Sequence, residues 1–378
     1  MSERAGRTSR WSSAATIKDV ARMSGVSPAT VTRVVNGHAS VRPETRARVE
    51  QAVLSLGYRP DSIAQALVTR STRTVGVLVP SSGDSFWGEV VAAIEDRAAE
   101  EGFSIILANT HGETSREVRA VELFFSRRVE GMIVASTPSD IQGWFSAKNF
   151  LNVPIVRINW DVAFAEDQVA EARFAPVEKM IGCIERVSRG SPFEEIAFDD
   201  FGAAVEVTRH LVALGHQRIA FVGLTSLRPA LLRYLGFRVA LEEVGLVPWA
   251  TIECQGTLDV ARAMAVQALS IPEPPTAIIA YDDIVAIGVM RGIRAMGRAV
   301  PADFSVIGFD DIEVAAYVEP PLTTVRQPKQ EMGRLAMDVV LRHLGQPTDP
   351  DVHPLPGELV VRMSSAPLSG ARKATLKH

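Results

Sequence analysis

A short stretch near the start of the sequence carries small and polar side chains at helical spacing. Over residues 28–37, a 3.6-residue repeat places two valines on one side and a polar stripe on the other, made of Ala29, Thr32, Arg33 and Asn36. Small side chains let a helix approach the edges of DNA bases, and Arg33 can donate two hydrogen bonds to a guanine, a contact that discriminates by roughly 1–3 kcal/mol. The same pattern also fits a helical hairpin that only caps a core.

Pairs of aspartates lie where apolar segments give way to helices. They begin at positions 199, 282 and 310. Paired carboxylates can hold a metal ion, although they more often cap helices. The sequence has no GxSxG, P-loop, HExxH or strand-borne GxGxxG, and its seven histidines show no ligand spacing. We therefore expect no metal, no cofactor and no enzymatic activity; the alternative is an α/β enzyme with an added helical domain.

Local signals predict further helices on both sides of the polar stripe. Thr16 can cap a helix from Ile17 to Ser24, and Gly25 allows the tight turn that follows. A third helix is predicted over residues 43–56, where apolar side chains recur at helical spacing. Two helices at a glycine turn, supported by a third, are the layout of a helix-turn-helix unit.

The charge is distributed unevenly along the chain. Residues 1–73 carry a formal charge of +7 and the remaining residues −11, although the whole chain carries only −4. A basic segment on an acidic body is expected when that segment alone meets a polyanion. The distribution therefore favours nucleic acid as the partner of the N-terminal segment.

After residue 73 the pattern changes to apolar strands that alternate with helices. Eight strands are predicted, with the sequences TVGVLVP, SIILANT, GMIVAS, PIVRIN, RIAFVGL, TIECQG, TAIIAYDD and FSVIGFDD. Continuous apolar strands between helices favour parallel sheets covered on both faces. Ligands of such sheets bind at the carboxyl ends of the strands.

Several motifs together resemble the lactose/galactose repressor family over nearly the whole chain. They are TIKDVARMSGVSPATVTRVVNG, VRPETRARV, LGYRPDSIAQAL and TVGVLVP, in this order and spacing. The resemblance implies an α/β fold with a helix-turn-helix headpiece, a hinge helix and a core of two subdomains like a periplasmic binding protein. It implies a dimer that binds double-stranded operator DNA as a repressor and responds to a small-molecule effector in the cleft between the subdomains.

The resemblance also implies which headpiece residues meet the DNA. Pro28, Ala29 and Arg33 are expected to read bases, Thr32 to lie near phosphate, and Leu67 of a hinge helix to wedge into the minor groove. The complete expected set is Thr16, Pro28, Ala29, Thr32, Arg33, Asn36 and Leu67. One departure is Arg42, where the family usually has a serine-type helix cap.

The same resemblance supplies candidates for the effector site. Phe86 and Trp87 match aromatic pocket residues, Arg233 matches an effector-binding arginine and Asp310 an effector-binding aspartate, while Asp282 stands where many members have Asn. Alternatively, the aromatic residues pack in the core and the aspartates cap helices. Two carboxylates and one arginine predict a neutral, polyhydroxylated effector of the sugar class.

One part of the predicted site is less regular. The segment PIVRIN ends at Asn159, where family members commonly carry Asp, and residues 161–199 exceed the family's usual connection by roughly two dozen residues. This insertion is expected either to cover the cleft or to lie on the surface of the dimer. The arginines that flank Arg233, at positions 228 and 238, are expected to face solvent.

These observations predict the domain boundaries. The headpiece is placed at 1–60, the hinge and linker at 61–73, the core at 74–364 and a tail at 365–378. Within the core, one subdomain is predicted to contain about 74–160 plus 312–328, and the other about 161–311 plus 329–364. The tail has no leucine heptads, so a dimer is expected rather than a coiled-coil tetramer.

The composition is that of an ordinary globular protein. It is 47% hydrophobic and 22% charged, with no apolar run of the length of a signal peptide or a membrane span. The two cysteines, Cys183 and Cys254, form no CxxC pair. A cytoplasmic protein without membrane contact is therefore expected, and a transport-type sugar-binding protein is a further alternative.

Overall fold

Three helices form the N-terminal unit, and they begin and end at the predicted residues: α1 (Ile17–Ser24), α2 (Pro28–Val35) and α3 (Pro43–Leu56). The carboxylate of Asp19 fixes the start of α1, because it accepts hydrogen bonds from the backbone N–H and the hydroxyl of Thr16 at 3.0 and 2.6 Å. Gly25 ends this helix in the left-handed conformation, with φ 67°. The valines of the apolar faces then close a small core, in which Val20, Val31 and Val49 are fully buried.

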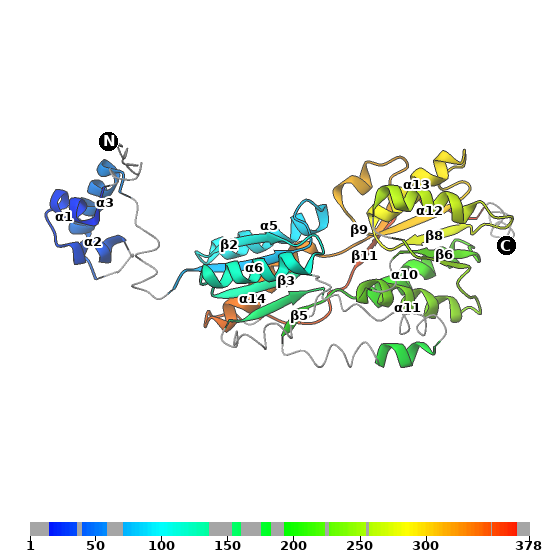
Figure 1. Ribbon diagram of the computed structural model, residues 1–378, viewed down its shortest axis with the longest axis horizontal. Helices are drawn as coiled ribbons and strands as arrows, with labels where there is room; N and C mark the ends of the chain where they lie inside the picture. Colours follow the sequence, from blue (N-terminus) through cyan, green and yellow to red (C-terminus); the bar gives the residue numbers. More distant parts are fainter. Residues whose placement is uncertain are drawn as a thin grey trace, which may run out of the picture. The chain divides into compact units, whose positions relative to one another are not determined.

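The computed structural model describes residues 15–35, 40–58, 71–135, 153–159, 175–182, 193–223, 227–254, 257–348 and 350–368. The chain divides between Thr72 and Arg73 into the helical unit and a larger α/β unit (Figure 1). The predicted hinge helix and Leu67, as well as Asn36, lie outside the described residues. No helix among the described residues is long and apolar enough to cross a membrane.

The first sheet of the α/β unit is entirely parallel, in the order β2-β1-β3-β4-β5. Its strands are β1 (Thr74–Val79), β2 (Ser104–Asn109), β3 (Gly131–Ala135), β4 (Ile155–Ile158) and β5 (Glu194–Ile196). Helices α5 (Ser85–Glu100) and α14 (Lys329–His343) share a core with one face, and α6 (Thr114–Ser126) with the other. Alternate residues of β1 face the two cores, as the strand repeat requires.

The second sheet has the order β11-β10-β9-β8-β6-β7, and only β11 is antiparallel to its neighbour. Its strands are β6 (Ile219–Val222), β7 (Ala250–Ile252), β8 (Ala277–Ala280), β9 (Ser305–Asp310), β10 (Thr323–Arg326) and β11 (Glu358–Val360). Helices α10 (Asp200–Ala213) and α11 (Arg228–Glu242) cover one face, and α12 (Leu258–Leu269) and α13 (Asp283–Ala295) the other (Figure 1).

The chain passes three times between the two subdomains, but the predicted allocation of three segments is wrong. Strand β5 pairs with β4 in the first sheet, whereas the sequence predicts residues 161–311 in the second subdomain. Strand β10 belongs to the second sheet, where Thr323 pairs with Ile307, whereas the sequence predicts residues 312–328 in the first subdomain. Helix α14 packs against α5, β3 and β4 of the first subdomain, whereas the sequence predicts residues 329–364 in the second. The apolar face of α14 fits either sheet in principle, so the sequence pattern could not decide between them.

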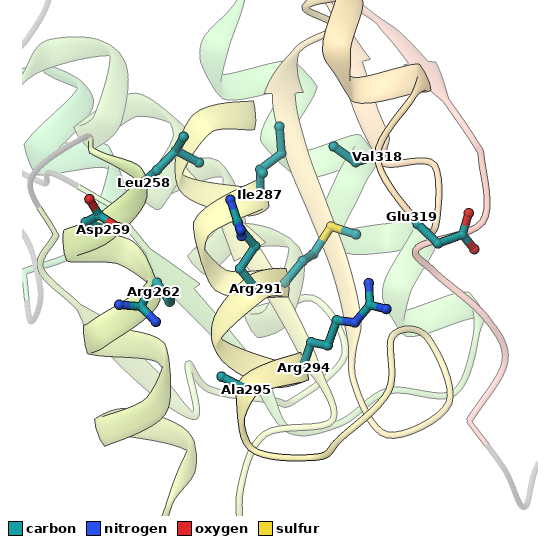
Figure 2. A pocket seen from close by; sticks show the side chains of 10 residues that line it. Leu258, Asp259, Arg262, Ile287, Arg291, Arg294, Ala295, Val318 and Glu319 are labelled. Atoms are coloured by element: carbon teal, nitrogen blue, oxygen red, sulfur yellow. The ribbon is translucent and has the colours of Figure 1, made fainter.

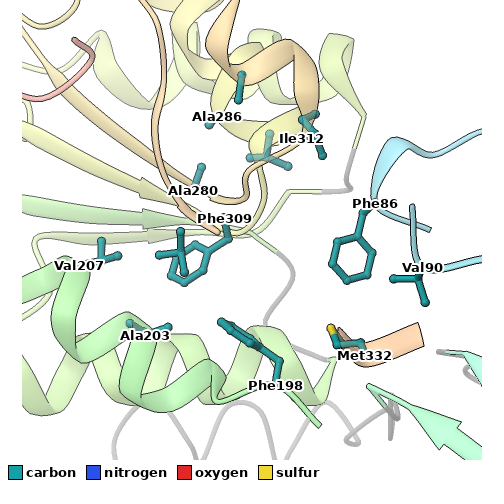
Figure 3. Packing of buried hydrophobic residues seen from close by; sticks show 14 of the residues in the cluster. Phe86, Val90, Phe198, Ala203, Val207, Ala280, Ala286, Phe309, Ile312 and Met332 are labelled. Carbon is teal, nitrogen blue, oxygen red and sulfur yellow. The ribbon is translucent and has the colours of Figure 1, made fainter. Parts of the chain in front are cut away.

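One continuous cluster of buried apolar side chains extends through both subdomains. Figure 3 shows Phe86 and Met332 of the first subdomain opposite Phe309 and Ile312 of the second, with Phe198 of the first crossover between them. Phe309 is fully buried and Phe198 is 3% exposed. The crossovers are therefore packed into the core, close to the carboxyl ends of the strands in both sheets.

Candidate functional site

The predicted base-reading side chains of α2 lie on the surface of the helical unit. Pro28, Ala29 and Arg33 are exposed, while Thr32 is half-buried and its hydroxyl donates to the carbonyl of Pro28 at 3.0 Å. Arg33 makes no hydrogen bond or ion pair with any residue that the structure describes. Its guanidinium is therefore available to a partner molecule.

Two other headpiece residues have structural positions that bear on their expected roles. Thr16 is exposed but is engaged with Asp19 at the start of α1, so its hydroxyl is already used in capping. Arg42 precedes α3 and makes no side-chain hydrogen bond to the helix end. The helix begins without a serine-type cap because Pro43 at its first position supplies a favourable φ and lacks an N–H group that would need a partner.

A cavity of about 120 Å³ lies at the carboxyl ends of the strands of both sheets. All six predicted effector residues line it, together with four that the sequence did not indicate: Phe86, Trp87, Asn159, Arg233, Asp282 and Asp310, joined by Asp84, Pro229, Tyr281 and Gln327. They come from the starts of α5 and α11, the ends of β4, β8 and β9, and the second crossover. The cavity is thus built from both subdomains and from one of the segments that join them.

Arg233 is buried deeply beside this cavity, with only 4% of its side chain exposed. Its Nε donates to Oδ1 of Asp200 at 2.7 Å, and its Nη1 donates to the carbonyl oxygen of Tyr281. The guanidinium carbon lies 4.8 Å from the ring centre of Tyr281 and 4.5 Å from that of Phe309. Its Nη2 is 3.8 Å from Oδ1 of Asp310, which leaves this edge of the guanidinium directed toward the cavity carboxylate.

Asp310 is held by the crossover that follows β10. Its Oδ1 accepts a hydrogen bond from Nε2 of Gln327 at 2.6 Å, and its carbonyl oxygen accepts one from Nζ of Lys329 at 3.1 Å. Lys329 also forms an ion pair of 2.8 Å with Glu89 of α5. The φ of Asp310 is 108°, a conformation that is rare for a residue with a side chain and that these contacts stabilise.

The other two cavity aspartates lie at the starts of helices. Asp282 caps α13, since its Oδ1 accepts from the backbone N–H of Val285 at 2.6 Å, and Asp84 caps α5 through the N–H of Phe86 at 2.8 Å. Capping uses part of each carboxylate and still leaves both residues in the lining of the cavity. Capping and ligand binding, which the sequence presented as alternatives for Asp282, are therefore compatible.

The remaining lining residues are ordered by their neighbours. Asn159 adopts a φ of 45°, and its side-chain oxygen accepts from the N–H of Phe198 at 3.1 Å. Phe86 is buried and Trp87 half-buried; their rings meet edge to face, with centres 4.9 Å apart. Trp160, next to Asn159, lies outside the described residues.

Burial changes the protonation of the cavity carboxylates. It raises the pKa of Asp282 to about 6 and that of Asp310 well above its ordinary value, and the negative charge of Asp84 adds to both shifts. Arg233 acts in the opposite direction on both groups. Burial alone would lower the pKa of Arg233, but the charges of Asp200 and Asp310 more than offset this effect and raise it.

The two arginines that flank Arg233 differ from expectation, because neither faces solvent freely. Arg228 forms an ion pair with Glu195, and both side chains are largely buried. Arg238 donates to the carbonyl oxygen of Ala175 at 3.1 Å and to Glu242 at 2.9 Å. The first partner belongs to residues 175–182 of the insertion, which pack against α11. Part of the insertion therefore lies on the outer side of the second subdomain.

A larger hollow of about 670 Å³ lies on the second subdomain, away from the six predicted effector residues. It is lined mainly by α12 and α13 and by the segment after the short helix η1 (Glu313–Ala316); Figure 2 shows Leu258, Arg262, Ile287, Arg291, Arg294, Val318 and Glu319 around it. Exposed apolar side chains adjoin the hollow, and Tyr317 is 80% exposed. Among the residues described, no group of three or more metal-ligating side chains is found.

Comparisons with known proteins agree with this arrangement. Residues 16–61 match the family described as bacterial regulatory proteins, lacI family, and residues 208–365 match the periplasmic binding protein-like domain. The ribose operon repressor of Escherichia coli (strain K12) is 34% identical over 341 residues, which cover 88% of this chain and 94% of that protein. Catabolite control protein A of Priestia megaterium is 32% identical over 355 residues, which cover 93% and 99%.

Among solved structures, the lac repressor dimer bound to operator and the anti-inducer ONPF superposes with a TM-score of 0.77 at 30% identity. The similarity covers 93% of this chain and 99% of that one. Similarity of this extent includes the helical unit as well as both subdomains. The chain therefore belongs to the lacI family of bacterial transcriptional regulators.

Proposed function

We propose that this protein is a repressor that binds operator DNA through α2 and releases or retains it according to a small hydroxyl-rich molecule, of the sugar class, in the cleft cavity. The observation that carries the proposal is the convergence of six residues, far apart in the sequence, on one cavity between two subdomains. Carboxylates, an amide and aromatic faces are the groups that bind hydroxyls and the apolar side of a sugar ring. The proposal assigns binding to this cavity rather than catalysis.

The proposed DNA contact follows from the exposed face of α2. Arg33 has a long planar donor group beside the short side chains of Ala29 and Thr32, so the helix backbone can lie close to the bases. The headpiece distinguishes this proposal from a sugar-binding protein of the transport type, which has no use for such a face. The relatives named above are a repressor and a control protein.

Two headpieces that read two half-sites require a symmetric dimer. We place a second copy of the chain against the side of the second subdomain that carries the hollow between α12 and α13. Leu258, Val314 and Tyr317 are exposed apolar side chains on this side, and three arginines and two acidic residues lie in or beside the hollow. An isologous contact buries such side chains against their symmetry equivalents.

The connection between cavity and DNA is proposed to run through the crossovers. Gln327 lies between β10 of one subdomain and α14 of the other, Lys329 begins α14, and both bind Asp310 of the cavity wall. A ligand that favours one angle between the subdomains shifts the population of that angle in the dimer. The spacing of the two headpieces then changes, and with it their fit to the operator.

The DNA-binding part is tested by selecting preferred sequences from a random library with the wild type and with Arg33→Ala. We expect the variant to lose preference at one position of each half-site, by roughly 1–3 kcal/mol. The matched control is Arg22→Ala, which removes the same charge from α1, where the side chain is 79% exposed. The control should weaken binding to all sequences by a similar factor. Unchanged preference in Arg33→Ala would show that α2 does not read the bases in this way.

A further inference from the structure

The charge of Arg233 is already balanced within the protein. Asp200 accepts from Arg233 Nε at 2.7 Å, and both side chains are at most 5% exposed. The carbonyl oxygen of Tyr281 accepts a hydrogen bond from Nη1, and the guanidinium carbon lies over the rings of Tyr281 and Phe309. One guanidinium therefore faces two carboxylates, Asp200 and, at 3.8 Å, Asp310, and its single positive charge cannot balance both.

Three carboxylates remain in the lining: Asp84, Asp282 and Asp310. They are close enough that the charge of Asp84 acts on both of the others, and that of Asp282 on Asp310. Lys329, at the start of α14, donates to the backbone carbonyls of residues 310 and 311 and pairs with Glu89, which balances its charge. The cavity therefore holds one more carboxylate than the sequence indicated. Because burial raises the pKa of Asp282 and Asp310, a positive group in the cavity would favour their charged forms.

Aromatic side chains lie next to this carboxylate wall. Phe86, Trp87 and Tyr281 line the same cavity, and Trp87 is only half-buried. A cation beside an aromatic face is attracted by the negative face of the ring, most strongly by that of Trp. Carboxylates combined with aromatic walls favour a ligand with a positive group and an apolar ring face over a neutral ligand of the same shape.

We infer that the ligand of this cavity is a sugar-like molecule that carries a protonated amino group, and that Asp84, Asp282 and Asp310 receive this group. The inference rests on the proposed function, since it names the chemical class of the effector for the same site. A protonated amine has donors for three carboxylates and cancels part of their mutual repulsion. A neutral sugar donates hydrogen bonds to the same oxygens but brings no positive charge to offset their repulsion.

The test measures thermal unfolding and calorimetric binding with matched sugars: glucose, glucosamine and N-acetylglucosamine, and the corresponding galactose and mannose series. We expect at least one amino sugar to raise the melting temperature by several degrees, and its neutral and N-acetylated counterparts to bind at least tenfold more weakly. Asp84→Asn and Asp282→Asn keep a helix-capping side chain, because Asn is as good a cap as Asp. Each variant should bind the amino sugar about tenfold more weakly or worse, and the difference in affinity between the amino sugar and the neutral sugar should become smaller.

The control variant is Asp96→Asn in α5, an exposed residue that lines neither this cavity nor the hollow between α12 and α13. It should leave the preference for the amino sugar unchanged. Equal or tighter binding of the neutral sugars would overturn the inference and leave the proposed sugar-responsive repressor intact. If no sugar in the three series binds, both the amino-sugar inference and the proposed sugar class fail, whereas the proposed DNA contact is judged separately by Arg33→Ala.

Discussion

Replacing Arg233 by Met should destabilise the α/β unit strongly, because it leaves a carboxylate in the core without its partner. The side chains of Arg233 and Asp200 are 4% and 5% exposed, and they are joined at 2.7 Å. Removal of one partner from a buried ion pair costs about 3–5 kcal/mol. In a unit of this size, each 1 kcal/mol lowers the melting temperature by roughly 2–4 °C, so a fall of roughly 10 °C is expected.

The assay is urea unfolding at pH 7, followed by circular dichroism at one fixed protein concentration, since association changes the apparent stability. The comparison includes Arg233→Met, Asp200→Asn and the double variant. In the double variant, Asp200→Asn removes the charge that Arg233→Met leaves unpaired. Its loss of unfolding free energy should therefore be about 2–3 kcal/mol smaller than the sum of the losses in the two single variants. Arg209→Met is the matched control: its pair with Glu243 is exposed and should contribute less than about 1 kcal/mol.

The pH dependence gives an independent check of the same reasoning. Burial raises the pKa of Asp200, and the loss of Arg233 removes the charge that opposes this rise. The folded variant then binds a proton more tightly than the unfolded chain does, so its stability decreases as the pH rises above about 4. The deficit of Arg233→Met should accordingly be smaller at pH 5 than at pH 7. A loss below about 1 kcal/mol, or additive losses in the double variant, would refute the assignment of this pair to the core.

Two further substitutions test the surroundings of the site. Asp283 is fully buried and accepts from the hydroxyl of Thr324 at 2.5 Å and the N–H of Ile312 at 2.9 Å, and burial raises its pKa to about 7. Ionisation of Asp283 should lower the stability of the fold as the pH rises from about 4 to about 7. Melting temperatures of Asp283→Asn should depend less on pH in this range. An unchanged pH dependence would mean that other groups cause it. Tyr317→Asp places a charge on an 80% exposed position beside the α12 and α13 hollow. In sedimentation the variant should be monomeric at a concentration where the wild type is dimeric. Its melting curve should remain cooperative, which shows that the monomer is folded. A variant that still dimerises like the wild type would move the interface elsewhere.

Much of the fold could be predicted because its signals are local. The three headpiece helices begin and end at caps and glycines, which act within one turn of the chain. The eight predicted strands are apolar segments between helices, and the carboxyl ends of such strands lie at one edge of each sheet. Residues as distant as Phe86 and Asp310 could therefore be assigned to one site from the sequence, with the family resemblance selecting among them.

The parts that could not be predicted depend on contacts between distant segments. Strands β5 (EEI), β10 (TTVR) and β11 (ELV) are short and contain charged or polar residues, so they lack the apolar run that marks the eight predicted strands. Asp84 looks like a simple helix cap, and Gln327 lies in a crossover without an apolar pattern, yet both line the cavity. Nothing in the sequence distinguishes a cap that borders a cavity from one that borders solvent.

The charge of a binding site is a further property that sequence reasoning handles poorly. The sequence pattern places Arg233 near Asp282 and Asp310. Its ion-pair partner is Asp200, which begins another helix, α10. From the sequence, Asp200 belongs to a pair of aspartates that is expected only to cap a helix. Other buried carboxylates also accept hydrogen bonds from separate elements, which the sequence does not reveal. The donors are the backbone N–H of Ile312, the hydroxyl of Thr324 and the amide of Gln327. Whether a cavity prefers a neutral or a positive ligand depends on which charges remain after such pairing. The pairing of Arg233 with Asp200 is therefore the contact on which the predicted preference for an amino group depends most directly.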